Sequence, residues 1–522
     1  VLLERGAHSY VSTFDGHPYV APFSGNIVEL CPVGALTSQP YRFQARPWDV
    51  EDAGSVCTLC PAQCNVTLTV RDERVLRVLA RDHPEVDDGW LCDRGRFAYP
   101  ALGGGRSKDG RGRENGERVT EPLLRDGGEL RPVSWERALE EAAAGLKRAG
   151  ERTGAIAGGE ATNEEGFLLA RLMREGLGSA HIDSRMAGTL PLELHRALND
   201  PRLQAKVSDL EFAHAVLVLA TDPIVDAPIL DLRLRKGVRR HGMKLVQATA
   251  GELRAGSGEL AATLSQAGEE IVVLWSERLT AGPDGAATAQ ALLALAETLS
   301  LAGVEGAGLL EIPSGANGRG LREAGVLPNA NPGLCATTAV TGATSAGEGT
   351  RERVSPKDGL DARGIARGLA EGALSGVYLL QSDPLLDLPD RELWERALKR
   401  ASTVVAQATF LTDGIRAHAN VVFPAEAYAE KEGTIVHPDG RIQRLRPAVA
   451  HPGSTRAGWG VLAEVAARIG LDLDLLTGVM TSQQLFDAVP FYAGLTLEEI
   501  GGKGVRWQER PAASAYPAQE CV

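Results

Sequence analysis

The chain has 522 residues, and at roughly 100–200 residues per domain this length predicts three or four domains. Hydrophobic residues make up 43% and charged residues 24%, an ordinary globular composition that excludes a mainly disordered chain. The 55 Lys and Arg residues and 68 Asp and Glu residues give a formal net charge of −13, which argues against nucleic acid or an anionic membrane surface as the partner.

The chain begins at Val1 without an initiator methionine, a basic segment or an apolar signal sequence, so we expect a mature chain or a fragment of a longer one. No stretch approaches about 18 uninterrupted apolar residues, and the sequence therefore predicts no membrane span. Only 7 cysteines occur, too few for a disulfide scaffold, and four of them fall between positions 57 and 92. These features predict a reducing, cytoplasmic compartment.

Short strand-like stretches with Gly and Pro between them fill the first 45 residues, and the last stretch includes Ile27–Leu30. Two more strand-like runs, Val66–Val70 and Arg74–Ala80, accompany the clustered cysteines. Gly103–Arg118 is rich in Gly and Arg, and we interpret it as a solvated loop rather than an anion-binding site.

From Ser134, a candidate N-cap, the pattern changes to short apolar strands that alternate with helices. The predicted strands are Ala215–Leu219, Lys244–Val246, Ile271–Trp275, Val377–Leu380 and Thr403–Ala406. The predicted helices include Glu164–Glu175, Asp231–Arg239, Thr288–Leu301 and Asp390–Arg400. This alternation is typical of parallel, doubly wound sheets, and its spacing predicts two lobes. The glycines of 315–320 are interpreted as a tight turn rather than a phosphate-binding loop.

The strongest chemical signal is Cys57-x2-Cys60-x3-Cys64, with Cys92 following after 27 residues. This spacing favours a [4Fe–4S] cluster, because each iron of the cubane takes one thiolate. Structural zinc, which more often uses two separated Cys-x2-Cys pairs, and free thiols remain alternatives. Asn65 and Gly95 flank these cysteines and are interpreted as turn formers.

Motifs over most of the chain resemble one family, the large iron–sulfur subunit of bacterial NADH–quinone oxidoreductase, respiratory complex I, within the molybdopterin oxidoreductase superfamily. The specific motifs are Phe23-Ser24-Gly25-Asn26, Val28-Glu29, Cys31-Pro32, Trp48, the three clustered cysteines with Asn65, and Leu91-Cys92-Asp93-Arg94-Gly95-Arg96-Phe97. The superfamily motifs are Thr162-Asn163-Glu164-Glu165, Ile182-Asp183-Ser184-Arg185, Ser382-Asp383-Pro384, Phe423-Pro424-Ala425, Glu430-Lys431-Glu432-Gly433-Thr434 and Gly440-Arg441-x-Gln443.

The resemblance implies an α/β fold in which a small [4Fe–4S] domain precedes two doubly wound α/β lobes of the molybdopterin-oxidoreductase type. We expect residues 1–45 to be the carboxy-terminal stub of a ferredoxin-like iron–sulfur domain, and residues 46–105 to be the [4Fe–4S] domain. Residues 106–475 are expected to form the two-lobed region, and residues 476–522 a carboxy-terminal tail.

The resemblance also implies two sets of ligands. Cys57, Cys60, Cys64 and Cys92 match the four ligands of an extra [4Fe–4S] cluster that some bacterial versions of the subunit carry. Because that cluster lies off the main electron path in the family, we expect it to stabilise the subunit. Cys31 matches the fourth ligand of another [4Fe–4S] cluster, whose other ligands are expected to precede residue 1, so the amino-terminal part of the subunit is expected to be missing.

Relatives with a molybdenum site, such as formate dehydrogenases, place a Cys or selenocysteine shortly after the segment that matches Ile182–Arg185. Here the segment continues Met186-Ala187-Gly188 without a thiol, and Arg94 stands where those relatives tend to have Lys. We therefore expect no molybdopterin and no catalytic residues in this chain. A molybdenum- or tungsten-dependent oxidoreductase of the formate dehydrogenase type is the alternative function, and a zinc-stapled interaction module is a third.

The function that the resemblance implies is electron transfer and scaffolding in the peripheral arm of the proton-pumping NADH–quinone oxidoreductase. The complex is an enzyme, whereas this chain is expected to turn over no substrate itself. The implied partners are the NADH- and FMN-binding subunit and the other iron–sulfur subunits, without nucleic acid. The implied location is cytoplasmic, at the inner face of the plasma membrane.

Overall fold

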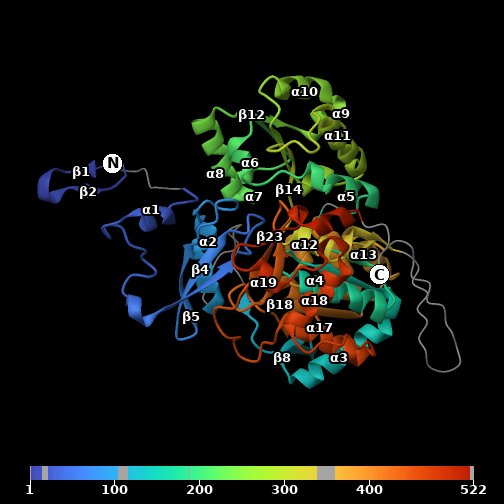
Figure 1. The fold of residues 1–522 in the computed structure, drawn as a ribbon. Helices are drawn as coiled ribbons and strands as arrows, with labels where there is room; N and C mark the ends of the chain where they lie inside the picture. The colour runs from blue at the N-terminus through green and yellow to red at the C-terminus, as the bar shows by residue number, and fades with distance from the viewer. Residues whose placement is uncertain (1, 14–20, 104–115, 187, 338–358, 518–522) are drawn as a thin grey trace.

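The structure, a computed structural model, describes residues 2–13, 21–103, 116–186, 188–337 and 359–517. Figure 1 shows a larger lobe at the bottom, a smaller lobe (green) at the top, and a blue amino-terminal part beside them. Within the described residues, no helix combines the length and apolar character that crossing a membrane requires. Of the predicted loop Gly103–Arg118, residues 104–115 lie outside the described residues.

The small amino-terminal domain is built on an antiparallel sheet. Its strands are β3 (Glu51–Val56), β4 (Asn65–Arg71) and β5 (Arg74–Ala80), in the order β3-β4-β5. Asp72 and Glu73 both take positive φ at the tight turn between β4 and β5, as a type I′ hairpin loop of two residues requires. The short helix α2 (Asp93–Phe97) follows the sheet. Both strand-like runs predicted here are confirmed.

The segment before this sheet contains β1 (Leu2–Leu3), β2 (Tyr10–Val11) and the helix α1 (Gly25–Leu30). The expected strand at Ile27–Leu30 is therefore wrong. The reason is a contact distant in sequence, because the Asp93 carboxylate accepts hydrogen bonds from the backbone amides of Ser24 (3.0 Å) and Gly25 (2.7 Å). A carboxylate at this place satisfies the free amides at the start of a helix.

The larger lobe surrounds a seven-stranded sheet in the order β10-β9-β17-β18-β20-β7-β8. The first five strands are parallel, namely β10 (Ile182–Asp183), β9 (Thr153–Ala157), β17 (Gly376–Leu380), β18 (Thr403–Ala408) and β20 (Val421–Pro424). The antiparallel pair β7 (Leu123–Asp126) and β8 (Glu129–Pro132) completes the sheet.

Helices cover both faces of this sheet because its strands are apolar on both faces. Tyr378 and Leu380 of β17 pack on the side of α3 (Trp135–Ala149), α4 (Asn163–Arg171) and α17 (Gly458–Ile469). Val377 and Leu379 pack on the side of α13 (Ala362–Glu371) and α15 (Arg391–Arg400). Ser134 is the N-cap of α3, as predicted, and its hydroxyl accepts from the Arg137 amide.

The smaller lobe has a four-stranded parallel sheet in the order β12-β11-β13-β14. Its strands are β11 (Ala215–Leu219), β12 (Lys244–Ala248), β13 (Ile271–Ser276) and β14 (Gly308–Ile312). The helices α6 (Asp209–Phe212) and α8 (Pro228–Lys236) cover one face, and α5 (Leu192–Leu198), α9 (Ala250–Ala255), α10 (Ser257–Ser265) and α11 (Gly285–Thr298) cover the other. The predicted fold class, a small domain followed by two doubly wound α/β lobes, is confirmed.

A further three-stranded sheet joins distant parts of the chain. It consists of β21 (Gly433–Val436), β22 (Arg441–Leu445) and β23 (Val505–Arg506). Residues expected as a carboxy-terminal tail also form α18 (Gly478–Ala488) and α19 (Leu497–Ile500). Phe486, Phe491 and Trp507 from this segment are buried in the core of the larger lobe.

Candidate metal centre

The four clustered cysteines converge in the small domain although they come from two separate segments. Cys57 directly follows β3, Cys60 and Cys64 occupy the loop before β4, and Cys92 is the N-cap of α2. A hydrogen bond of 2.9 Å from the Cys57 amide to the Cys64 carbonyl oxygen closes the loop. Each of the four residues is at most 6% exposed. The fold therefore shields all four thiols from water.

Burial is the largest cause of a raised pKa at each of these thiols. It raises the pKa of Cys60 to about 12 and also raises the pKa of Cys57, Cys64 and Cys92. The charges of neighbouring cysteines add to the rise in the pKa of Cys57, Cys60 and Cys64. The Arg94 guanidinium lowers the pKa of Cys57, Cys60 and Cys92. Four ionised thiolates here need a further positive group, such as a metal cluster supplies.

Gly95 of α2 keeps the space beside these sulfur atoms open. A Cβ at this position would lie 3.4 Å from Cys57 Sγ and 2.7 Å from Leu91 Cδ1, and the Gly95 amide donates a hydrogen bond of 3.5 Å to Cys92 Sγ. The interpretation of Asn65 and Gly95 as turn formers is wrong, because Asn65 begins β4 and Gly95 lies within a helix. The absence of a side chain at Gly95 serves close packing around the thiols.

Four thiols are a donor set that an iron–sulfur cluster can use. A structural zinc needs four ligands, each at about 2.0–2.3 Å, whereas a [4Fe–4S] cluster binds each thiolate at a different iron. The donor set of four cysteines in an apolar pocket thus fits the cubane.

Cys31 lies apart from this buried group, at the carboxyl end of α1, and is partly exposed. Hydrogen bonds from backbone amides, that of Leu36 above all, lower the pKa of its thiol. The other amides come from the intervening residues Val33, Ala35 and Gly34. A loop that aims several amides at one sulfur stabilises a thiolate.

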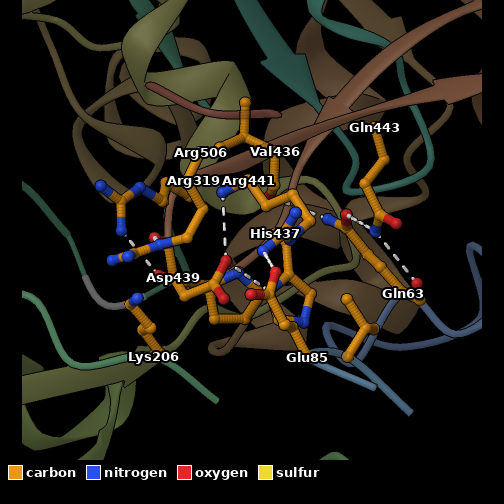
Figure 2. A network of polar contacts seen from close by, with 12 residues as sticks. Gln63, Glu85, Lys206, Arg319, Val436, His437, Asp439, Arg441, Gln443 and Arg506 are labelled. Carbon is orange, nitrogen blue, oxygen red and sulfur yellow. Dashed lines mark hydrogen bonds and ion pairs between the residues drawn. The ribbon is translucent and has the colours of Figure 1, made fainter. Parts of the chain in front are cut away.

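The glutamine between the second and third cysteines, Gln63, ties the cysteine loop to the rest of the molecule (Figure 2). Its side-chain amide donates to the carbonyl oxygens of Ala316 (2.7 Å) and Val436 (2.8 Å). The Gln443 amide donates to the Gln63 carbonyl oxygen (3.1 Å) and the Asn65 amide donates to Gln443 Oε1 (3.0 Å). Sequence reasoning missed this role of the glutamines, because their partners are hundreds of positions away.

The same network continues around the turn between β21 and β22 (Figure 2). His437 Nδ1 lies 2.7 Å from Asp439 Oδ1, and both side chains are fully buried. Burial by itself would raise the pKa of Asp439, but His437, Arg506 and Arg441 outweigh it and hold this pKa well below its usual range. Arg441 also pairs with Glu85 of the small domain. The turn is therefore fixed against the domain that holds the cysteines.

A cavity of about 560 Å³ lies where the cysteine loop meets both lobes. The residues that line it follow the carboxyl ends of β9, β10 and β17 in the larger lobe and of β11, β13 and β14 in the smaller lobe. Cys60, Arg94 and Tyr428 border the same cavity. The carboxyl ends of parallel strands are the usual place for ligand sites in α/β proteins.

The segment that would carry a molybdenum ligand in catalytic relatives also borders this cavity. Asp183, Ser184, Arg185 and Met186 line it, and the Met186 amide donates to Glu277 Oε1 at 2.9 Å. Ala187 lies outside the described residues. Among the described lining residues the only cysteine is Cys60, which belongs to the four-thiol group.

Comparison with known families accounts for these features. The molybdopterin oxidoreductase family matches residues 118–251 and 247–468, which is most of the chain. The chain belongs to the molybdopterin oxidoreductase family. The Fe4S4 domain of molybdopterin oxidoreductases matches residues 53–102, around the four thiols, and this match supports an iron–sulfur cluster there. The ferredoxin-like domain of the third NADH-quinone oxidoreductase subunit matches residues 1–37, around Cys31.

Two relatives of this chain have the same subunit name. The G subunit of the NADH-quinone oxidoreductase of Streptomyces coelicolor is 32% identical over 95% of this chain and 60% of its own length. The corresponding protein of Mycobacterium bovis is 33% identical over 93% of this chain and 61% of its own length. This chain thus spans about three fifths of these relatives. The predicted resemblance is confirmed, and the relatives favour it over the formate dehydrogenase alternative.

A solved structure shares the fold. Acetylene hydratase from Pelobacter acetylenicus has a TM-score of 0.55, with 14% sequence identity, and the match covers 80% of this chain and 69% of that chain. At this identity the similarity concerns the arrangement of the lobes alone.

Proposed function

We propose that this chain is an iron–sulfur electron-transfer and scaffold part of the peripheral arm of an NADH–quinone oxidoreductase. The observation that carries the proposal is the convergence of Cys57, Cys60, Cys64 and Cys92 in one buried pocket, in a chain whose relatives are named as a subunit of that enzyme. These four residues are the proposed ligands of one [4Fe–4S] cluster. A bound cluster of this kind accepts and releases one electron at a time.

The residues of the pocket perform defined tasks around such a cluster. The backbone amides of Leu59, Ala62 and Gly95 donate to the sulfur atoms of Cys57, Cys60 and Cys92, respectively, and favour their thiolate forms. The apolar neighbours Leu68, Val78 and Leu91 exclude water from the sulfur atoms. Such contacts set both the stability and the reduction potential of an iron–sulfur site.

The four proposed ligands come from two separate segments of the small domain, and this arrangement suggests a scaffold role for the cluster. One segment supplies three ligands and α2 supplies the fourth, so a cluster would join two halves of the small domain. The network of Gln63 and Gln443 then links the small domain to β22 and the larger lobe. Stabilisation of the subunit, rather than obligatory electron transfer, is the role we propose for this cluster.

We also propose the remaining parts of the assignment. Cys31 is the ligand of a second [4Fe–4S] cluster whose other ligands lie outside this chain. Residues 1–45, 46–105, 106–475 and 476–522 are the ferredoxin-like stub, the cluster domain, the two-lobed region and the carboxy-terminal part. The partners are the NADH- and FMN-binding subunit and the other iron–sulfur subunits, in a complex at the inner face of the plasma membrane.

The chain is proposed to hold no molybdopterin and to turn over no substrate itself. Two features support this: the segment Ile182–Met186 offers no thiolate to a molybdenum ion, and Arg94 is engaged with the Val225 carbonyl oxygen at 2.8 Å. Acid extraction of the native complex should yield no pterin. Recovery of pterin in a stoichiometric amount would favour the molybdenum-dependent alternative.

The ligand assignment is tested by spectroscopy of the protein after anaerobic reconstitution. Reduced wild-type protein should give the electron paramagnetic resonance (EPR) signal of a [4Fe–4S] cluster, and Cys60→Ser should lose it. The matched control is Cys31→Ser, which should keep the signal because Cys31 lies outside the four-thiol pocket. Stoichiometric zinc without iron would contradict the proposal.

A further inference from the structure

Tyr428 brings a hydroxyl group into the apolar pocket of the four thiols. The residue follows β20, is 8% exposed, and packs in the same buried group as Cys57, Cys60 and Cys64. It also borders the cavity that Cys60 lines. The buried surroundings of the sulfur atoms thus include the phenol group of Tyr428.

The Tyr428 hydroxyl oxygen is buried and has no hydrogen-bond partner among the residues that the structure describes. By contrast, the hydroxyl of the fully buried Tyr378 donates to Gln407 Oε1 at 3.0 Å. An unpaired buried hydroxyl is destabilising, and native proteins rarely keep one without a reason. The Tyr428 hydroxyl is therefore free to donate to a group bound in the thiol pocket.

The charges around Tyr428 show what kind of partner suits it. Tyr428 belongs to one buried group with Cys57 and lines the same cavity as Cys60, which places the phenol beside the thiol pocket. Burial is the main cause of the raised pKa of Tyr428, and the negative charges of Cys57 and Glu160 add to the rise. A protonated phenol next to a thiolate can act as a hydrogen-bond donor.

We propose that Tyr428 donates a hydrogen bond to a sulfur atom of the [4Fe–4S] site and thereby raises the reduction potential of the cluster. This inference rests on the proposed function, since it requires the cluster. Reduction adds negative charge to the sulfur atoms, so a donated hydrogen bond stabilises the reduced form more than the oxidised form. Tyr428 is therefore a positioning residue that tunes the site without ligating it.

Tyr428→Phe tests this role because it removes the hydroxyl oxygen and keeps the ring. In EPR-monitored redox titrations, the midpoint potential of the variant should shift to a more negative value. In electron–nuclear double resonance spectra, the coupling of one proton that exchanges in deuterated water should be lost. The matched control Tyr378→Phe, which removes a buried hydroxyl elsewhere, should change neither signal.

The stability of the apo protein provides a second readout. The Tyr428 hydroxyl makes no hydrogen bond within the described part of the protein. Apo Tyr428→Phe should therefore unfold at the same or a higher denaturant concentration than the apo wild-type protein. Earlier unfolding would mean that the hydroxyl has a protein partner and would overturn the inference. If the wild-type protein shows the cluster signal, and Tyr428→Phe has the same midpoint potential and the same proton coupling, the inference about Tyr428 is overturned while the proposed function stands. Absence of any cluster signal in wild type would overturn the proposed function with it.

Discussion

The Gln443 side-chain amide donates a hydrogen bond of 3.1 Å to the carbonyl oxygen of Gln63, a residue 380 positions earlier in the chain. This contact joins the loop of the clustered cysteines to β22, and Figure 2 shows it beside the buried pair of His437 and Asp439. The cysteine pocket is therefore held from outside its own domain. This arrangement explains how a site with ligands on a loop and a short helix can have fixed geometry.

Gln443→Ala should loosen this connection. The variant leaves the amide of Asn65 and the carbonyl oxygen of Gln63 without their buried partner, at a cost of about 1–3 kcal/mol in the free energy of unfolding. Chemical denaturation measures the loss. The control is Gln483→Ala, because Gln483 makes an exposed bond within its own helix, to Asp487. Equal stability of the two variants would contradict the role of Gln443.

Gly95→Ala should disturb the thiol pocket. The added Cβ would meet the buried Leu91 side chain at 2.7 Å, and overpacking of this kind costs about 1–3 kcal/mol. Iron content per chain after reconstitution should fall accordingly. Gly460→Ala is the matched control in a helix, since nothing lies within 4 Å of a Cβ there, and it should stabilise by about 0.5–1 kcal/mol. Full iron content in Gly95→Ala would show that cluster binding does not need the open space at Gly95.

Lys431→Met should destabilise the larger lobe strongly. Lys431 Nζ lies 2.9 Å from Glu165 Oε2, and the side chains are only 2% and 3% exposed. Removing the ammonium leaves a buried carboxylate uncompensated, which costs about 3–5 kcal/mol. Glu129→Ala, which breaks the exposed pair with Arg131, should cost less than about 1 kcal/mol. Thermal and chemical unfolding measure the stability of both variants. Similar losses in the free energy of unfolding would contradict the stabilising role of the buried pair.

Asp183 should make stability depend on pH. Burial raises its pKa to about 7 from the ordinary value of 3.8. Its contribution to stability is therefore fully present below about pH 3.8 and is lost as the pH rises toward 7, with a slope of about 1.4 kcal/mol per pH unit for one proton.

Asp183→Asn removes this titration. Its free energy of unfolding should therefore fall less steeply with pH than that of wild type between the two pKa values. The Asn amide also replaces the oxygen that accepts from the Ala362 amide, so a constant offset between the proteins is expected. The slope is the quantity to compare, and identical slopes would contradict the assignment.

Sequence patterns predicted the strands well where burial on both faces leaves a continuous apolar run. The strand Ala215–Leu219 has the predicted bounds because all five side chains are buried. The strand predicted at Ile27–Leu30 is wrong, because the Asp93 carboxylate that caps α1 lies far along the chain. A local pattern contains no information about such a contact.

The sequence predicts the ligands of the candidate site but not the residues that surround them. The cysteine spacing reflects ligand chemistry, so the candidate ligands were visible in the sequence. The roles of Gln63 and Tyr428 arise from tertiary packing, and no spacing rule identifies them. The sequence predicts a turn at Gly95, because the approach of the Cys57 sulfur to this residue arises only from the three-dimensional packing.

The central claim is that four buried thiols in this chain hold one [4Fe–4S] cluster. The most direct test is quantification of iron and acid-labile sulfide, together with EPR, on anaerobically reconstituted wild-type and Cys92→Ala proteins. We predict about four iron and four sulfide per wild-type chain with a [4Fe–4S] signal on reduction, and loss of that signal in Cys92→Ala. Zinc in place of iron, or an unchanged signal in Cys92→Ala, would contradict the claim.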